Sequence, residues 1–280
     1  MTLTIVRNIL DLRREMASWR TKGLTSAVVP TMGALHHGHV TLVQEGLKRA
    51  DRVVTTIFVN PRQFAASEDL GRYPRTEASD VAQLAEAGAH LVFAPAPEEV
   101  YPPGFATTVV MAGPAKAGLE DKFRPQFFDG VATVVAKLFT QSGADFAMFG
   151  EKDYQQLLVV KRMARDLDLP IEVVGVPTVR EQSGLALSSR NAYLSKMEHL
   201  KAASLYRTLM QAAVKIRAGH KPSRATAAAR RAMTTRGFRV DYVAARNAET
   251  LALPRTMDEP LRLLAAVWLG GTRLIDNIAV

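Results

Sequence analysis

Hydrophobic positions along the first two thirds of the chain follow two alternating patterns. Apolar residues that recur at three- and four-residue steps predict helices over residues 7–22, 39–50, 80–87, 128–140 and 154–167. Short apolar runs between them predict buried strands over 26–29, 53–59, 91–94, 146–149 and 173–176. We expect Pro30 to end the first of these strands. Strands that alternate with helices predict an α/β fold with a parallel sheet covered on both faces.

This alternation stops at a polar, loop-like segment over residues 178–195. Beyond it the pattern predicts a long helical region over 197–220, a second helix over 224–236, and strands over 238–244, 261–268 and 272–278. Gly270–Gly271 between the last two strands is typical of a tight hairpin turn. We therefore expect two domains, a larger one over 1–178 and a smaller α+β domain over 179–280.

Composition removes several classes of chemistry. The 280 residues include no cysteine, which excludes disulfides, thiolate catalysis, thiolate zinc sites and iron–sulfur clusters. No apolar run approaches 18 residues, and the first 20 residues lack the apolar core of a signal peptide. We therefore expect a cytoplasmic protein with no membrane span.

The net charge of +9 is unevenly distributed. Residues 1–178 hold 19 Lys and Arg against 20 Asp and Glu, whereas residues 179–280 hold 17 against 7. A basic last third indicates either an anionic partner, such as nucleic acid or a phosphorylated small molecule, or a solvated basic surface. Composition alone does not decide between these alternatives.

The segment Pro-Thr-Met-Gly-Ala-Leu-His-His-Gly-His, residues 30–39, follows a predicted strand and opens a predicted helix. The carboxyl end of a strand that meets a helix N-terminus is a common phosphate-binding site in α/β proteins. His36 and His39 are three residues apart, so both rings face one side of the first turn. Imidazoles there can donate hydrogen bonds to phosphoryl oxygens. The alternatives are a histidine-rich loop, or a metal site on His36, His37 and His39 that would need a further ligand.

Three more segments carry polar side chains at predicted strand ends or in loops. Asn60 and Gln63 offer neutral amides that suit a hydroxyl or a carboxylate. Lys152 lies at a helix start, where a cation is unfavourable unless it meets an anion, and Gln156 follows one turn later. Asp153 is expected to cap that helix, with assistance to a magnesium ion as the alternative. Ser188, Ser189 and Arg190 suit a phosphate clamp.

The His-x-Gly-His arrangement of residues 36–39 resembles the signature of the nucleotidyltransferase superfamily. Together, the four segments resemble the pantoate–β-alanine ligase family over residues 26–195. The matching strings are Pro-Thr-Met-Gly-Ala-Leu-His, Phe-Val-Asn-Pro-x-Gln-Phe, Glu-Asp-Leu (68–70) with Tyr-Pro-Arg-Thr (73–76), Phe-Gly-Glu-Lys-Asp-Tyr-Gln-Gln-Leu, and Val-Pro-Thr-Val-Arg-Glu with Ser-Ser-Arg-Asn. Four positions depart from the family pattern: Ala65, Gln126, Phe127 and Leu187.

This resemblance implies a Rossmann-like domain, a smaller C-terminal domain that acts partly as a lid, and a homodimer. It implies that ATP and (R)-pantoate give pantoyl adenylate, which β-alanine attacks, with Mg²⁺ accompanying ATP. It assigns His39, His36, Lys152 and Arg190 to catalysis and Gln63 and Gln156 to pantoate, with Gln63 also touching β-alanine. The ATP-binding positions it implies are Met32, Gly33, Ala34, Leu35, His36, His37, Gly38, His39, Gly150, Glu151, Lys152, Asp153, Val179, Leu187, Ser188, Ser189 and Arg190.

Two other functions are weighed against this one. Another nucleotidyltransferase would share the His-x-Gly-His loop, but it is not expected to share the Asn-Pro-x-Gln-Phe or Gly-Glu-Lys-Asp segments. A nucleic-acid-binding protein would fit the basic last third. That region lacks interleaved aromatic residues and carries no recognised nucleic-acid motif. We therefore expect small-molecule substrates, with no nucleic-acid or membrane partner.

Overall fold

The computed structural model describes residues 3–64, 70–256 and 258–280. Ala65, Glu68 and Asp69 of the motifs above lie outside these ranges. None of the described helices is long and apolar enough to cross a bilayer.

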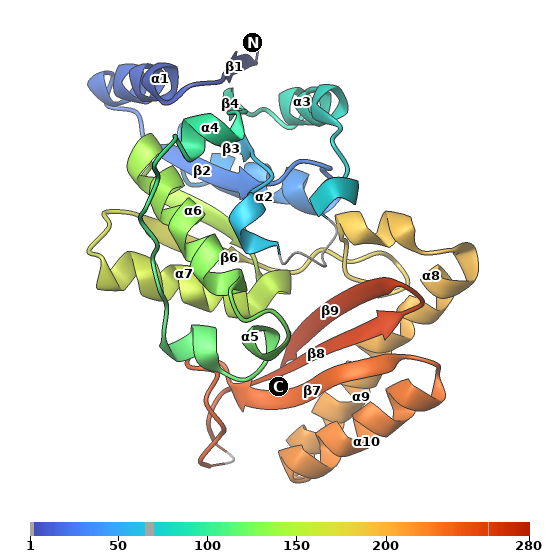
Figure 1. The fold of residues 1–280 in the computed structure, drawn as a ribbon. Coiled ribbons are helices and arrows are strands. Elements are labelled where there is room, and N and C mark those ends of the chain that lie inside the picture. Colours follow the sequence, from blue (N-terminus) through green and yellow to red (C-terminus); the bar gives the residue numbers. More distant parts are fainter. Residues whose placement is uncertain (1–2, 65–69, 257) are drawn as a thin grey trace.

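Six parallel strands form the larger sheet (Figure 1). They are β1 (Thr4–Val6), β2 (Ser26–Thr31), β3 (Arg52–Ile57), β4 (Leu91–Phe93), β5 (Phe146–Gly150) and β6 (Glu172–Val176), in the order β1-β4-β3-β2-β5-β6. From β2 the chain continues to β3 and then β4 on one side of the sheet. The strands β5 and β6 lie on the other side of β2, so the direction of winding reverses between β2 and β5. Ligands of open α/β sheets bind at such a reversal, outside the carboxyl ends of the strands.

The expectation that Pro30 ends β2 is wrong: the strand includes Pro30 and ends at Thr31. Pro30 has no N–H to give to a ladder. Its neighbour on one side is Thr56 of β3, whereas the pairing of β2 with β5 stops at Val28. Pro30 therefore lies beyond the paired part of β2 and β5, where β5 accepts no backbone hydrogen bond from β2.

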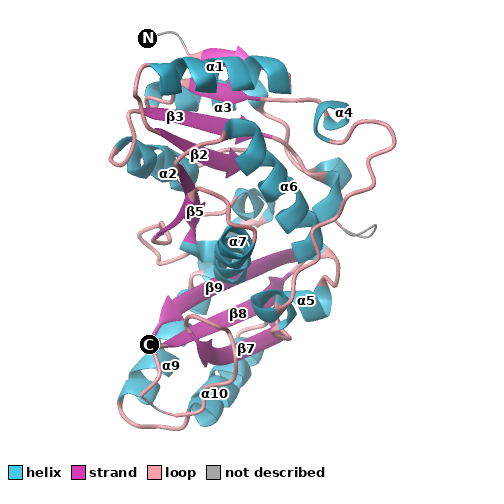
Figure 2. Cartoon of the chain, turned by 90° about the vertical axis from the view of Figure 1, so that its left-hand side faces the viewer, coloured by secondary structure: helices cyan, strands magenta, loops and turns pink. Residues whose placement is uncertain are grey.

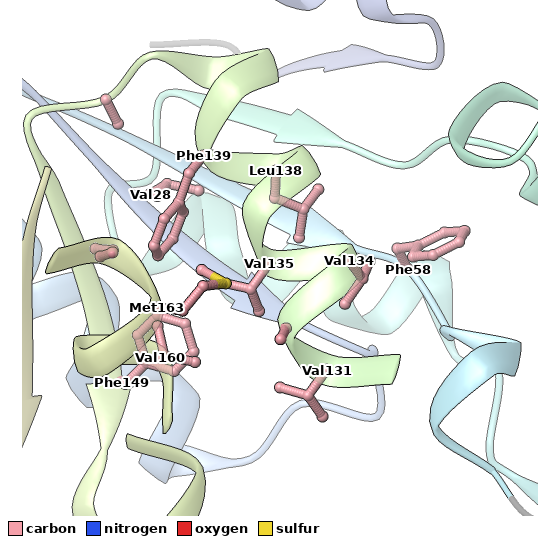
Figure 3. Close-up of a cluster of buried hydrophobic side chains, with 14 of the residues drawn as sticks. Val28, Phe58, Val131, Val134, Val135, Leu138, Phe139, Phe149, Val160 and Met163 are labelled. Carbon is pink, nitrogen blue, oxygen red and sulfur yellow. The ribbon is translucent and has the colours of Figure 1, made fainter. Parts of the chain in front are cut away.

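Helices cover both faces of this sheet because the strands are apolar on both sides. Val28 of β2 packs in the cluster under α1 (Ile9–Thr21), α6 (Phe127–Ser142) and α7 (Tyr154–Asp166). The neighbours of Val28, Ala27 and Val29, face the cluster under α2 (His37–Leu47) and α3 (Glu77–Glu86). Figure 3 shows α6 laying Val131, Val134, Val135 and Leu138 along the first cluster. The two apolar clusters thereby support the sheet beneath its carboxyl edge.

Short elements fill the connections of the larger domain. They are α4 (Pro97–Val100), α5 (Glu120–Phe123) and the 3₁₀ turns η1 (Pro61–Gln63), η2 (Leu70–Arg72), η3 (Gly113–Lys116), η4 (Glu151–Asp153) and η5 (Ser189–Tyr193). The sequence pattern did not predict α4, α5 or β1, which are short and partly exposed, whereas β4 is equally short but fully buried and was predicted.

The C-terminal part is a three-stranded antiparallel sheet with helices on one face (Figure 2). Its strands are β7 (Arg239–Asn247), β8 (Leu261–Leu269) and β9 (Thr272–Ala279), and its helices are α8 (Lys196–Ala202), α9 (Ser204–Arg217) and α10 (Pro222–Thr235). The hairpin at Gly270–Gly271 is confirmed, since Leu269 pairs with Thr272. The single helical region expected over 197–220 is instead two helices that meet at Ala203. There the Ser204 hydroxyl donates to the carbonyl of Lys201 at 2.7 Å, which competes with helical bonding.

The free face of this small sheet packs on the larger domain. Leu264 and Ala244 meet Leu119 in a small apolar cluster, and Arg273 donates to both carboxylate oxygens of Glu120 at 2.6 and 2.9 Å. The predicted fold class, a parallel α/β sheet with a smaller α+β part, is confirmed. The boundary at residue 178 stays a prediction, placed between the end of β6 and the start of α8.

Candidate active site

A cavity of about 230 Å³ opens at the carboxyl ends of β2, β3, β5 and β6. Fourteen of the site residues that the family resemblance implies line it: Met32, His36, Gly38, His39, Gln63, Gly150, Lys152, Asp153, Gln156, Val179, Leu187, Ser188, Ser189 and Arg190. They come from four separate segments of the chain, and the strand order brings them together. A wider hollow of about 690 Å³ beneath it, toward the C-terminal sheet, shares Lys152, Gln156 and Arg190 as walls.

Five of the implied ATP-binding residues do not line this cavity. Leu35 is buried in the core beside α2, and Gly33 and Ala34 form the turn before it. His37 is exposed, and Glu151 is paired with Arg262 at 2.9 Å. These five residues therefore do not face the cavity in this structure, and their direct contact with ATP stays a prediction.

The two histidines of the first segment form one unit. His36 caps α2, and its Nδ1 accepts the N–H of Gly38 at 3.1 Å, while Nδ1 of His39 accepts the N–H of His36 at 3.2 Å. The ring centroids lie 4.1 Å apart. With both Nδ1 atoms occupied as acceptors, each neutral ring carries its proton on Nε2.

Burial keeps both rings neutral. It lowers the pKa of His36 to about 4, with help from the positive charge of Lys152. It lowers the pKa of His39 to about 3, with smaller effects of His36 and Lys152. At neutral pH the pair therefore offers two N–H donors, oriented by the backbone, in the cavity that Lys152 also lines.

Asp80 holds the turn that precedes the histidines, and the sequence analysis missed this role. Its carboxylate, on α3 and 1% exposed, accepts the N–H groups of Ala34 and Leu35, both at 2.9 Å. Ala34 has φ = 51°, a left-handed conformation that is unfavourable for a residue with a Cβ. Two charge-assisted hydrogen bonds offset that cost. Nothing in the local sequence signals a contact across 46 residues.

Gln63 is oriented by neighbouring amide and thioether groups. Its Oε1 accepts from Nδ2 of Asn60 at 3.0 Å, and its Nε2 donates to Sδ of Met32 at 3.2 Å. Asn60 is itself fixed by the Tyr101 hydroxyl at 2.8 Å and by the carbonyl of Gly130 at 3.2 Å. The expected neutral amides are therefore both present at the strand end, but Asn60 acts as a support for Gln63.

Lys152 and Asp153 lie in the 3₁₀ turn between β5 and α7. The Lys152 ammonium is 3.8 Å from the Asp153 carboxylate, and the two side chains are 19% and 47% exposed. The expectation that Asp153 caps α7 is wrong: Asp153 is the residue before the helix, but its side chain makes no capping hydrogen bond. Its backbone torsions, φ = −92° and ψ = 59°, are not those of a capping residue in extended conformation. The carboxylate instead lines the cavity.

The polar segment after β6 folds into a small hairpin and a 3₁₀ turn. The N–H of Leu187 donates to the carbonyl of Val179 at 3.0 Å, so these two candidates lie side by side. Ser188 caps η5 by accepting the N–H of Arg190 at 3.3 Å. Ser189 is 3.4 Å from the hydroxyl of Tyr73, which belongs to another matching string. The predicted clamp thus lies against the cavity that holds the histidines.

Three arginines of the basic last third are held in ion pairs and have little exposure to solvent. Arg180 pairs with Asp276 at 2.8 Å, Arg262 with Glu151 at 2.9 Å and Arg273 with Glu120 at 2.6 Å. The three arginine side chains are only 11–17% exposed. Part of the positive charge therefore fixes loops of the larger domain to the C-terminal sheet.

The alternative of a histidine metal site gains no support, because no three His, Asp or Glu side chains converge on a metal position within residues 3–64, 70–256 and 258–280. The arrangement suits a different chemistry. Cationic and N–H donors face a cavity that also holds two neutral glutamine amides, which matches an anionic phosphate chain beside a small polar acid.

Comparisons with known proteins agree with this assignment. A family model described as pantoate-beta-alanine ligase matches residues 4–279. A pantothenate synthetase 2 from Bradyrhizobium diazoefficiens is 56% identical over 99% of this chain and 98% of its own length. The crystal structure of pantothenate synthetase from Thermus thermophilus is 46% identical, with a TM-score of 0.91 over 98% of both chains.

A further solved structure carries ligands in its description. It is the pantoate-beta-alanine ligase from Francisella tularensis, complexed with beta-gamma ATP and beta-alanine, at 31% identity and a TM-score of 0.84 over 99% of this chain and 97% of that one. Together with the match of the family model to nearly the whole sequence, these similarities establish that the chain belongs to the pantoate-β-alanine ligase family.

Proposed function

We propose that this chain condenses (R)-pantoate with β-alanine at the expense of ATP, giving pantothenate, AMP and pyrophosphate through a pantoyl adenylate. The observation that carries the proposal is the neutral pair His36 and His39, whose Nδ1 atoms are held by backbone N–H groups in the cavity shared with Lys152. Membership of the family supports the same reaction.

In the first step the pantoate carboxylate attacks the α-phosphorus of ATP. A new P–O bond forms, the bond from the α-phosphorus to the bridging oxygen breaks, and pyrophosphate leaves. Both reactants are anions, so Lys152 and Arg190 offset their repulsion. The Nε2–H groups of His36 and His39 donate to oxygens that gain negative charge. Gln63 and Gln156 hold pantoate through neutral amides, which leave its carboxylate nucleophilic.

In the second step the neutral amine of β-alanine attacks the acyl carbon of the adenylate. An amide bond forms, the bond from the acyl carbon to the phosphate oxygen breaks, AMP leaves, and the amine loses one proton. No protein nucleophile is needed, because the substrate carboxylate was activated in the first step. The absence of cysteine is therefore compatible with this chemistry.

Magnesium belongs to this proposal as the partner of ATP, held chiefly by phosphate oxygens. The position of Asp153 supports the binding of magnesium, because this carboxylate is 47% exposed, lines the cavity and makes no capping hydrogen bond. An oxygen ligand of that kind is what magnesium prefers, and the ion would add charge compensation at the phosphates. We also propose a homodimer in the cytoplasm, as the family resemblance implies.

The test is an assay of AMP and pyrophosphate with each substrate omitted in turn. With ATP and pantoate alone, pyrophosphate is expected up to about one equivalent per site, and β-alanine is expected to make turnover continuous. Continuous AMP release without pantoate, or cytidylyl or adenylyl transfer to another acceptor, would contradict the proposal. Sedimentation velocity measures the oligomeric state separately.

A further inference from the structure

We propose that Asn277, on strand β9 of the C-terminal sheet, is a positioning residue for the ATP half of the reaction, because it holds the backbone that carries Lys152. This inference rests on the proposed function. Nδ2 of Asn277 donates to the carbonyl oxygens of Glu151 at 2.9 Å and of Lys152 at 2.8 Å. Asn277 is 3% exposed, so both hydrogen bonds are shielded from water.

The turn that carries Lys152 has little local structure to hold it. Residues 151–153 form a single 3₁₀ turn. Gly150 before it has no side chain that could cap the turn, and the side chain of Asp153 at its end makes no capping hydrogen bond. An isolated 3₁₀ turn has poor hydrogen-bond geometry. Its position therefore depends on contacts from elsewhere in the fold, and Asn277 supplies two of them.

Arg262 of β8 completes the support around Asn277. Its Nε donates to Oδ1 of Asn277 at 2.6 Å, which fixes the side-chain amide with Nδ2 toward the two carbonyls. Its Nη2 donates to the carboxylate of Glu151 at 2.9 Å, and its guanidinium lies 4.0 Å from the ring centre of Tyr154. Every residue from 151 to 154 except Asp153 is thus contacted by the Asn277–Arg262 pair.

The preceding residue, Asp276, acts in the same way on the other nucleotide segment. Its two carboxylate oxygens accept from the two Nη atoms of Arg180, both at 2.8 Å, and Arg180 follows Val179 directly. Asp276 is also 3% exposed. Adjacent side chains of β9 therefore hold two loops of the site, whose residues are 96 to 126 positions away. The C-terminal sheet is part of the frame of the ATP site.

The position of Lys152 matters for the first half-reaction, in which pyrophosphate leaves, more than for the second. The Lys152 side chain is only 19% exposed, so its stem has little room to compensate for a shift of the backbone, and the distance of the ammonium from the phosphates follows the position of that backbone. A misplacement of about 1 Å can cost about a hundredfold in rate. Lys152 is needed while the pyrophosphate is leaving, whereas the attack of β-alanine takes place after that charge has gone.

Two variants test the proposal. Asn277→Asp keeps the shape but cannot donate to the two carbonyls, and Asn277→Ala removes the side chain without adding charge. Pantoate-dependent exchange of label between pyrophosphate and ATP reports the first step. Formation of pantothenate from pre-formed pantoyl adenylate and β-alanine reports the second. We expect the first rate to fall by about 10- to 100-fold and the second to change less than about threefold, which is near the limit of a mere packing effect.

Two controls separate positioning from loss of stability. Asn8→Ala also removes a hydrogen bond between an asparagine side chain and the backbone, here one that Asn8 accepts from the N–H of Asp11 at 2.8 Å, at the far end of the larger domain, and both rates should stay at the wild-type value. In a Lys152→Ala background, Asn277→Ala should cause no further loss in the first step, because Asn277 acts through Lys152.

Equal losses in both half-reactions, additive losses in the double variant, or an unchanged first step would overturn the role of Asn277. Failure of the proposed function would look different, since wild-type protein would then show no pantoate-dependent exchange at all.

Discussion

Gly130 of helix α6 lies directly against the carbonyl group of Arg62, in the turn that carries Gln63. A Cβ at position 130 would stand 2.9 Å from the backbone nitrogen of Gln63 and closer still to the carbonyl of Arg62. Glycine inside a helix costs about 1 kcal/mol relative to alanine. The close approach of the two backbones explains why the chain accepts that cost here.

Gly130→Ala should therefore impair the site although alanine favours helices. The added methyl must push the turn over residues 61–63 away from α6, and Gln63 moves with it. We expect kcat/KM for pantoate to fall by at least about tenfold, with a loss of about 1–3 kcal/mol in the free energy of unfolding from overpacking. Gly271→Ala is the matched control, since a Cβ there meets open space. A wild-type kcat/KM in Gly130→Ala would show that the position of Gln63 is unimportant.

The histidine pair predicts a sharp contrast between neighbouring residues. His39→Ala removes an Nε2–H donor and the acceptor for the N–H of His36, so turnover should fall by about two to four orders of magnitude. His37→Ala alters an exposed ring that does not line the cavity and should leave turnover within a few-fold. Steady-state kinetics on both variants measure this difference, and similar losses at the two positions would contradict the assignment.

Lys152→Ala should separate the two chemical steps. Loss of the ammonium leaves phosphate charge uncompensated while pyrophosphate departs, so pantoate-dependent pyrophosphate release should fall by about a hundred- to a thousandfold, to a rate that remains measurable. Pre-formed pantoyl adenylate should still react with β-alanine at a smaller loss. Lys161→Ala, an exposed lysine on α7, serves as the control and should behave as wild type. An equally severe defect in the second step would assign Lys152 a different role.

The partly buried histidines also predict a pH dependence of stability. The pKa of His36 is lowered to about 4 in the folded protein, from an ordinary value of 6.5. Between these values the unfolded chain binds more protons, so the stabilisation is complete above pH 6.5 and is lost as the pH falls toward 4. His36→Asn keeps a side-chain acceptor for the N–H of Gly38 but does not titrate.

Urea unfolding between about pH 7 and about pH 4.5 measures this effect. The slope of unfolding free energy against pH should be smaller in His36→Asn than in wild type, by up to about 1.4 kcal/mol per pH unit, the value for one proton. Identical slopes in the two proteins would mean that His36 is not held neutral by burial.

The hydrophobic pattern was sufficient for the central elements of the fold. Strands such as β2 and β5 are apolar on both faces, and helices such as α6 have a strong apolar period, so both could be predicted locally. The edge strand β1 could not, because three residues with Ile5 exposed carry no pattern. The break at Ala203 was also missed, since the apolar period runs through it.

The sequence predicted side chains of the candidate site that line the cavity. It did not predict Asp80 and Asn277, which hold the backbone of the segments around the cavity. His36, Gln63 and Lys152 follow strands, and their residue types indicate phosphate and acid binding. Asp80 and Asn277 act through backbone groups that are 46 and 125 residues away. No local spacing encodes such contacts, because they arise only when the sheet order brings the segments together.

The proposed reaction requires that the pantoate carboxylate attack the α-phosphorus of ATP in this cavity. Pantoate labelled with ¹⁸O in both carboxylate oxygens tests it directly in the complete reaction with β-alanine, with mass spectrometry of the nucleotide and phosphate products. We expect AMP that carries one ¹⁸O atom, because the attacking oxygen stays on the phosphate when the amide forms, together with unlabelled pyrophosphate. Label in inorganic phosphate together with ADP, or AMP without label, would contradict it.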